Sequence, residues 1–152
     1  YEICLSDWSS DVCSSDLVEV AVGILLKNSS NVLMGKRPDG KPYAGYWEFP
    51  GGKLEPNESV ALALYRELKE ELGIEISLDS SHYQELMIIE HDYPHAYVRL
   101  HVCLVQQWQG EPVGLEKQEL SWQSLWHPQL TVDPVLPAAW PMIEYLQAYL
   151  QK

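Results

Sequence analysis

The stretch GKLEPNESVALALYRELKEELGI, residues 52–74, contains the clearest pattern in the chain. It predicts a helix over residues 59–72, because Asn57 or Ser59 can cap its amino end and Gly73 can end it. Five apolar residues fall within about 100° of one another at 3.6 residues per turn: Ala61, Leu64, Tyr65, Leu68 and Leu72. We expect this apolar stripe to face a sheet.

Three carboxylates, Glu67, Glu70 and Glu71, fall on an arc that we place opposite the apolar stripe, with Ala63 beside them. A solvated charged face is one explanation, and Arg66 can then pair with Glu70. The other is a site for a hard divalent cation such as Mg2+, which takes one or two carboxylates and completes its shell with water and phosphate oxygens. Gly51-Gly52, just before the stretch, lets the backbone approach closely, so a carbonyl can also reach the metal.

The segments around this helix predict a sheet. Strands are expected over residues 18–27, 32–36, 47–50, 83–93, 96–108 and 120–125, with a turn at Pro94-His95. A last helix, which Pro141 can start, has an apolar face of Met142, Ile143, Leu146, Tyr149 and Leu150. Residues 37–46 form a loop with two Pro and two Gly, and loops of that length in a compact domain are usually functional. The fold class is therefore mixed α and β, a sheet with helices packed on it.

Composition excludes several classes of protein. The chain has 152 residues with 46% hydrophobic residues, which fits one globular domain and not a disordered chain. No apolar run reaches the roughly 18 residues that a membrane span needs, and no basic-then-apolar secretory signal opens the chain. The net charge of −12 argues against tight binding to polymeric nucleic acid. An acidic protein can still bind phosphates if cations lie between them.

Residues 1–17 differ from the rest of the chain. They contain four acids and neither Lys nor Arg, and SDWSSDVCSSDL resembles the translation of sequencing-adapter DNA. We expect residues 1–17 to be a non-native or disordered tail and residues 18–152 to be the domain, with a net charge of −8. One cysteine, Cys103, then remains as a buried thiol, which fits a reducing cytoplasm.

The spacing within residues 52–74 resembles the Nudix box without a departure: Gly52, five residues, Glu58, seven residues, Arg66-Glu67-Leu68, one residue, Glu70-Glu71, one residue, Gly73-Ile74. The segments AVGILL, WEFPGGK, YPHAYVRLH, WQGEPVGLEKQELSW and LPAAWP follow the MutT-like branch of the Nudix hydrolases in order. The resemblance implies an α/β/α sandwich that uses Mg2+, with Mn2+ as a substitute. It implies hydrolysis of a nucleoside triphosphate to the monophosphate and pyrophosphate by water attack at the β-phosphorus, with 8-oxo-dGTP as substrate. Such an enzyme cleanses the nucleotide pool as a monomer or homodimer, without polymeric nucleic acid or a membrane.

The resemblance also implies roles for individual residues. The metal ligands are the Gly51 carbonyl, Glu70 and Glu71, with Glu67 at the metal as general base or water-orienting group. Arg66 and Glu58 form an orienting ion pair, and Glu116 is a distal acid that approaches the metal, unless it is an ordinary loop acid. Substrate contacts fall on Arg37, Glu48, Phe49, Pro50, Gly51, Gly52, Lys53 and Ala139.

The chain departs from the branch at Ala139, where an Asn that reads the oxidised guanine is common. The Ala139 side chain neither donates nor accepts a hydrogen bond, so selectivity for 8-oxoguanine is in question. Trp140, Trp47 and Tyr46 either stack on a base or serve packing. Two other readings are a Nudix hydrolase of dCTP, another nucleotide or a nucleoside-diphosphate derivative, and a non-catalytic module that binds 8-oxoguanine. The second would have lost the acids that this chain keeps. His91, His95 and His101 show no metal-ligand spacing.

Overall fold

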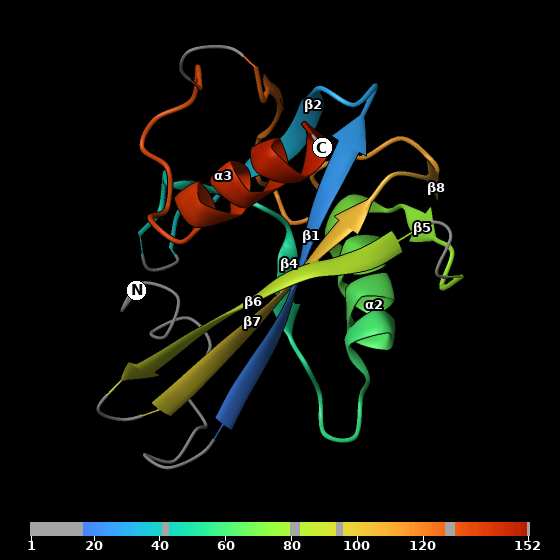
Figure 1. Ribbon diagram of the computed structural model, residues 1–152, viewed down its shortest axis with the longest axis vertical. Coiled ribbons are helices and arrows are strands. Elements are labelled where there is room, and N and C mark those ends of the chain that lie inside the picture. The colour runs from blue at the N-terminus through green and yellow to red at the C-terminus, as the bar shows by residue number, and fades with distance from the viewer. Residues whose placement is uncertain (1–16, 41–42, 80–82, 94–95, 127–129, 152) are drawn as a thin grey trace.

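The computed structural model describes residues 17–40, 43–79, 83–93, 96–126 and 130–151. In this part of the chain, two helices lie on opposite faces of a mixed sheet, which confirms the predicted class (Figure 1). The helices are α2 (Val60–Leu72) and α3 (Ala139–Leu150). The strands are β1 (Leu17–Lys27), β2 (Asn31–Lys36), β3 (Trp47–Glu48), β4 (Gly51–Lys53), β5 (Glu75–Ile76), β6 (Tyr83–Tyr93), β7 (Ala96–Val105), β8 (Trp108–Gln109) and β9 (Leu120–Ser124).

The sheet is built around β1. Its path runs β3-β2-β1-β7-β6, with β4 also paired to β1 and β9 to β2. β1 and β7 are parallel from Leu17↔Tyr97 to Leu25↔Val105, whereas the other pairs of this sheet are antiparallel. The short β5 and β8 pair separately. This arrangement places the glycines of β4 directly beside β1, next to α2.

Alternate residues of the central strands fill the two layers of the core. Val20 and Val22 of β1 pack toward α3, whereas Ala21 and Leu25 pack toward α2. Both faces of β1 are buried, which is why its sequence is almost continuously apolar. Gly23 faces α2 so closely that a Cβ there would lie 2.9 Å from Leu64 Cδ1. The sheet and the carboxylate-bearing helix are therefore in tight contact.

Helix α2 has the predicted ends, but not the predicted faces. The Ser59 side chain accepts a hydrogen bond from Leu62 N at 3.2 Å, and Gly73 ends the helix in the left-handed conformation (φ 72°). The buried residues are Ala63, Leu64, Leu68 and Leu72. Ala63 is therefore buried and not on a solvated carboxylate face, whereas Ala61 and Tyr65 are only partly buried.

The buried arc therefore runs from Ala63 through the positions of Glu67 and Glu71 to Leu64, Leu68 and Leu72. The prediction that all three carboxylates point away from the apolar face is wrong for Glu67 and Glu71, because β4 lies beside the helix there. It holds for Glu70, which is exposed.

Other boundaries differ from the predictions by local effects. The strand expected over residues 96–108 ends at Val105, and Trp108 belongs to β8, which pairs with the unpredicted β5. Helix α3 begins at Ala139, so Pro141 lies within its first turn, where its missing N–H costs nothing. Of the tail expected over residues 1–17, residues 1–16 lie outside the described residues, as does the Pro94-His95 turn. Leu17 is not part of a tail, because it is the first residue of β1 and pairs with Tyr97. No helix among those described is long and apolar enough to cross a bilayer.

Candidate active site

A cavity of about 310 Å³ lies between α2, β4, the 114–118 loop and the start of α3. Its lining includes the carboxylates of Glu48, Glu67, Glu70, Glu71 and Glu116. A second part of the lining is apolar and comes from β1, β7 and the α3 region: Val20, Val22, Leu100, Leu136, Ala138, Ala139 and Met142. The cavity thus combines concentrated negative charge with an apolar wall. Such a lining suits a ligand that has both a charged group and a flat ring.

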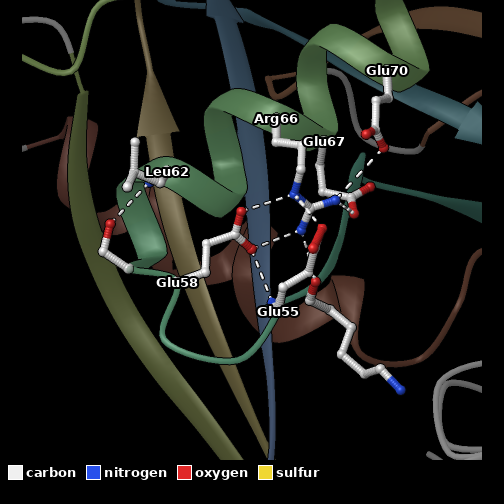
Figure 2. A network of polar contacts seen from close by, with 8 residues as sticks. Glu55, Glu58, Leu62, Arg66, Glu67 and Glu70 are labelled. Carbon is white, nitrogen blue, oxygen red and sulfur yellow. Dashed lines mark hydrogen bonds and ion pairs between the residues drawn. The ribbon is translucent and has the colours of Figure 1, made fainter.

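Arg66 organises the carboxylates of the box (Figure 2). Its Nε and Nη2 donate to the two carboxylate oxygens of Glu58, both at 2.8 Å, which is a bidentate pair. Its Nη1 donates to Glu67 Oε1 at 2.8 Å and lies 3.6 Å from Glu70 Oε2. Glu55 Oε1 lies 3.2 Å from Nε, and the Lys53 carbonyl accepts from Nη2 at 3.1 Å. One guanidinium therefore contacts Glu58, Glu67 and Glu70 and links them to the backbone of β4.

These ion pairs shift the pKa values of the groups that form them. The hydrogen bonds that Arg66 donates lower the pKa of Glu58, and acceptance of such bonds by Glu58 and Glu67 raises the pKa of the Arg66 guanidinium. Glu58 and Arg66 thus form the ion pair that the resemblance implied, and its orienting role stays a prediction.

Glu67 is fitted against a glycine. A Cβ on Gly52 would lie 2.4 Å from Glu67 Cδ, so the carboxylate occupies the space that a side chain would fill. Burial is the largest cause that raises the pKa of Glu67, and repulsion from Glu70 and Glu116 adds to it against the lowering effect of Arg66. A carboxylate with a raised pKa is a better proton acceptor near neutral pH than an ordinary one.

Glu71 is held at the backbone of β4. Its Oε2 accepts a hydrogen bond from Gly51 N at 2.9 Å. Burial raises its pKa well above the usual range for a carboxyl group, and the charges of Glu67, Glu116 and Glu48 raise it further. Gly51 itself has φ 154° and leaves no room for a side chain, because a Cβ would lie 2.1 Å from the Ala21 carbonyl oxygen.

Arg37, at the end of β2, is 4% exposed and pairs with Glu48 through Nη1 to Oε2 at 3.1 Å. Both line the cavity beside Phe49, Pro50 and Lys53. Phe49 is 6% exposed and belongs to the core cluster on the α3 side, so it serves packing as well as lining the cavity. The segment predicted to contact the nucleoside is thus brought together with the carboxylates.

The aromatic residues considered for base stacking lie elsewhere. Trp47 is buried in the core cluster, and Trp140 is exposed on α3. Neither they nor Tyr46 are among the described residues that line the cavity, whereas Ala139 is. His101 is buried in β7, with Nε2 3.0 Å from Glu19 Oε1, which accounts for it as a strand residue. The Cys103 thiol is buried, and burial raises its pKa to about 12.

Sequence reasoning missed Gln118, which lines the cavity next to Glu116. Its Nε2 donates to the Glu71 carbonyl at 3.2 Å, and its Oε1 accepts from Glu116 N at 2.9 Å. Leu136, Ala138 and Met142 were also not predicted as lining residues. A pattern in one chain gives no signal for them, because their contacts reach across the sequence.

The donor set suits a hard divalent cation. Five carboxylates line one cavity, and burial together with their mutual repulsion raises the pKa of Glu67 and Glu71. A bound cation would relieve the repulsion. Oxygen donors of this kind match Mg2+ and Mn2+ better than softer metals. Within the described ranges, however, no three Asp, Glu, His or Cys side chains are arranged as a ready-made metal site. Glu70 is turned toward Arg66, and Glu71 toward Gly51 N.

Known proteins resemble this chain in sequence and in fold. The family model described as "NUDIX domain" matches residues 18–148. The chain is 35% identical over 130 residues to an 8-oxo-dGTP diphosphatase of Escherichia coli K12, which covers 86% of this chain and 96% of that protein. It is also 35% identical over 136 residues to the CTP pyrophosphohydrolase of the same strain, which covers 87% of this chain and 93% of that protein.

Solved structures agree with these matches. A structure from work on MutT of Aliivibrio salmonicida and Vibrio cholerae superposes with a TM-score of 0.72 at 30% identity. The match covers 88% of this chain and 98% of that one.

Proposed function

The chain belongs to the Nudix family, and from this premise we propose that it hydrolyses a nucleoside triphosphate to the monophosphate and pyrophosphate, with 8-oxo-dGTP as substrate. The observation that carries the proposal is the cavity in which Glu67 and Glu71, both with raised pKa, lie next to an apolar wall. The carboxylate part suits a cation-bound triphosphate, and the apolar part suits a base. Relatives named 8-oxo-dGTP diphosphatase support the substrate. A cytoplasmic location fits a nucleotide substrate and the buried free thiol of Cys103, the one cysteine among the described residues.

Glu67 is the proposed proton acceptor, and Arg66 holds its Oε1 in place. A water oxygen attacks the β-phosphorus while Glu67 takes a proton from that water. The bond between the β-phosphorus and the α–β bridging oxygen breaks, and that oxygen leaves with the nucleoside monophosphate. Glu70, Glu71 and the Gly51 carbonyl are the proposed holders of Mg2+, with Glu116 approaching from its loop. When bound, the cation would neutralise phosphate charge and lower the pKa of bound water.

A specific observation favours a second candidate for the base of the substrate. Ala139 lines the cavity and offers no hydrogen bond from its side chain, while Arg37 and Glu48 are the nearby polar pair. A buried polar contact gives most of the discrimination between bases. Because the Ala139 side chain supplies no such contact to an oxidised guanine, CTP or dCTP is the alternative substrate. A relative named CTP pyrophosphohydrolase matches this chain at 35% identity.

The test is pyrophosphate release from 8-oxo-dGTP, dGTP, dCTP and CTP by the purified protein in Mg2+. We expect the highest kcat/KM for 8-oxo-dGTP. A higher kcat/KM for CTP or dCTP would assign the enzyme to the second substrate class. No pyrophosphate from any of the four would overturn the proposed reaction. The variant Ala139→Asn is expected to raise the ratio of kcat/KM for 8-oxo-dGTP over dGTP, because it adds an amide to the cavity wall.

A further inference from the structure

We propose that Gln118 is a positioning residue that holds Glu116 at the carboxylate site, an inference that rests on the proposed function. The side-chain amide of Gln118 joins two parts of the molecule that are 47 residues apart in sequence. Its Nε2 donates to the carbonyl of Glu71 at 3.2 Å, and its Oε1 accepts from the backbone N–H of Glu116 at 2.9 Å. One amide therefore ties the loop that carries Glu116 to the helix that carries Glu67 and Glu71.

The attachment point is the carboxyl end of α2. A helix leaves its last carbonyls without partners inside the helix, so they are available to donors from elsewhere. The Glu71 carbonyl accepts from both Leu115 N at 3.0 Å and Gln118 Nε2. The Leu72 carbonyl accepts from Val113 N at 3.0 Å. Residues 113–118 thus dock on the last turn of α2 by three hydrogen bonds, of which the Gln118 bond is the one made by a side chain.

The conformation of residues 113–118 depends on a close approach between Gly114 and the backbone of Gln118. Lys117 has φ 68°, and its N–H donates to the Gly114 carbonyl at 3.1 Å. A Cβ on Gly114 would lie 2.1 Å from the Gln118 carbonyl oxygen, so the chain doubles back on itself there. This turn brings the Gln118 side chain back across Glu116. Without the amide, the Glu116 N–H at the tip would lose its acceptor.

Electrostatic repulsion explains why Glu116 needs to be held. Glu116 lines the same cavity as Glu67 and Glu71, so three carboxylates of like charge share one space. Glu116 is itself exposed and has open solvent on its other side. In the absence of a cation, like charges favour movement of this loop away from α2. The Gln118 amide opposes that movement and keeps the acid where a cation between the carboxylates would contact it.

An amide of this length is the side chain that meets both requirements. It supplies a donor for the Glu71 carbonyl and an acceptor for the Glu116 N–H without adding charge. Gln118→Met keeps the length and removes both hydrogen bonds. Gln118→Asn keeps both groups but is one methylene too short. Gln147→Met is the matched control, because Gln147 Nε2 also donates to a backbone carbonyl, that of Leu125 at 2.7 Å, outside the cavity.

The experiment measures Mn2+ binding to the nucleotide-free protein by electron paramagnetic resonance of the free ion. We expect Gln118→Met and Gln118→Asn each to raise the Kd for Mn2+ about tenfold, the usual effect of removing a group that orients a metal-binding side chain. Glu116→Gln should raise it by a similar factor. The double variant Gln118→Met with Glu116→Gln should bind no more weakly than Glu116→Gln alone, because both changes remove the same contribution. Gln147→Met should bind as the wild type does.

Three results would overturn the inference. The first is a Kd for Mn2+ in Gln118→Met and Gln118→Asn that equals the wild-type Kd. The second is a double variant in which the effects of Gln118→Met and Glu116→Gln on the Kd multiply. The third is a wild type that takes up no Mn2+. Circular dichroism checks the fold, and if Gln118→Met unfolds, Gln118→Asn decides. Failure of the proposed function is distinguishable, because it appears as no pyrophosphate release from a wild type that still shows this Mn2+ pattern.

Discussion

Neighbouring carboxylates of one helix acquire different properties from what lies opposite each of them. Glu70 is exposed, with its nearest charge partner at 3.6 Å, whereas Glu67 fills the space left by Gly52 and Glu71 accepts a hydrogen bond from Gly51. The glycines of β4 therefore shape the site together with the acids. They let two carboxylates approach the sheet backbone, where burial raises their pKa.

Replacement of Glu67 by Gln is expected to lower kcat by about 10²–10⁴, which is the usual contribution of a general base. The change keeps the shape of the side chain and an oxygen for Arg66, so the fold should persist and KM should change little. Steady-state kinetics with 8-oxo-dGTP would measure this. Glu144→Gln, an exposed acid on α3, is the control and should be indistinguishable from the wild type. A kcat for Glu67→Gln within a few-fold of the wild type would refute the role of this residue.

Replacement of Glu71 by Gln is expected to stabilise the protein in the absence of divalent cations at neutral pH. Its pKa is raised in the folded state, so the folded protein holds this proton more tightly than the unfolded chain. The free energy of unfolding therefore falls as pH rises from about 4.5 through the raised pKa. Gln has no such ionisation and keeps an oxygen for Gly51 N. Tm should rise by about 2–4 °C for each 1 kcal/mol gained, and the gain should vanish toward pH 4.

Glu58→Gln is the matched comparison for that experiment and should have the opposite sign. Arg66 lowers the pKa of Glu58, so its contribution to stability is present above about pH 4.5 and is lost as pH falls below it.

Addition of Mg2+ should then raise the Tm of the wild type more than that of Glu71→Gln, because a ligand stabilises the state that binds it. A Glu71→Gln variant that is less stable than the wild type at pH 7 without cations would contradict the assigned cause.

Helix α2 packs on the sheet through one face, and the carboxylates of Glu67 and Glu71 lie at the edge of that same face. Its buried leucines pack on Ala21 and Leu25 of β1 and on Cys103 of β7. Its two ends are fixed by the Ser59 cap and by Gly73. The positions of Glu67 and Glu71 therefore depend on how this helix packs on the sheet.

Removal of one of these contacts tests the helix as an element. Leu68 is fully buried, so Leu68→Ala should cost about 2–5 kcal/mol in the free energy of unfolding. Leu62 lies on the same helix but is 50% exposed, so Leu62→Ala should cost less than about 1 kcal/mol. Urea denaturation would measure both. Equal losses for the two variants would show that α2 does not pack as described.

At the scale of the whole molecule, α2 and α3 cover opposite faces of the sheet, and the cavity draws on both layers (Figure 1). The carboxylates come from α2 and its neighbouring loop, while the apolar wall comes from β1, β7 and the start of α3. The parallel pairing of β1 with β7 is central to this arrangement, because it aligns Val20 with Leu100 in the cavity wall.

Removal of residues 1–16 is expected to leave kcat and Tm nearly unchanged. The domain pattern in the sequence starts at residue 18, and the family match starts there too. The deletion keeps Leu17, which is the first residue of β1 and pairs with Tyr97. Differential scanning calorimetry and the pyrophosphate assay would compare the two forms. A large loss of Tm or kcat would show that the segment is part of the folded domain.

The sequence by itself determined the parts of this protein that depend on local spacing. The order of Gly, Glu, Arg and the Glu pair in residues 52–74 predicted the helix, its two caps and the family, and alternation and apolar runs predicted most strands. Strand ends such as Val105 and the short β5 escaped prediction, because they depend on which segment pairs with which.

Only the tertiary structure decided which of the acids are buried and what they contact. The angular position of a residue on a helix gives its direction but not what lies there, so Ala63 was assigned to the wrong face and the burial of Glu67 and Glu71 was missed. The link from Gln118 to the Glu71 carbonyl joins residues that no local pattern relates. Such contacts are fixed by packing of the helix and the loop on the sheet, because only the folded chain brings these groups within hydrogen-bond distance.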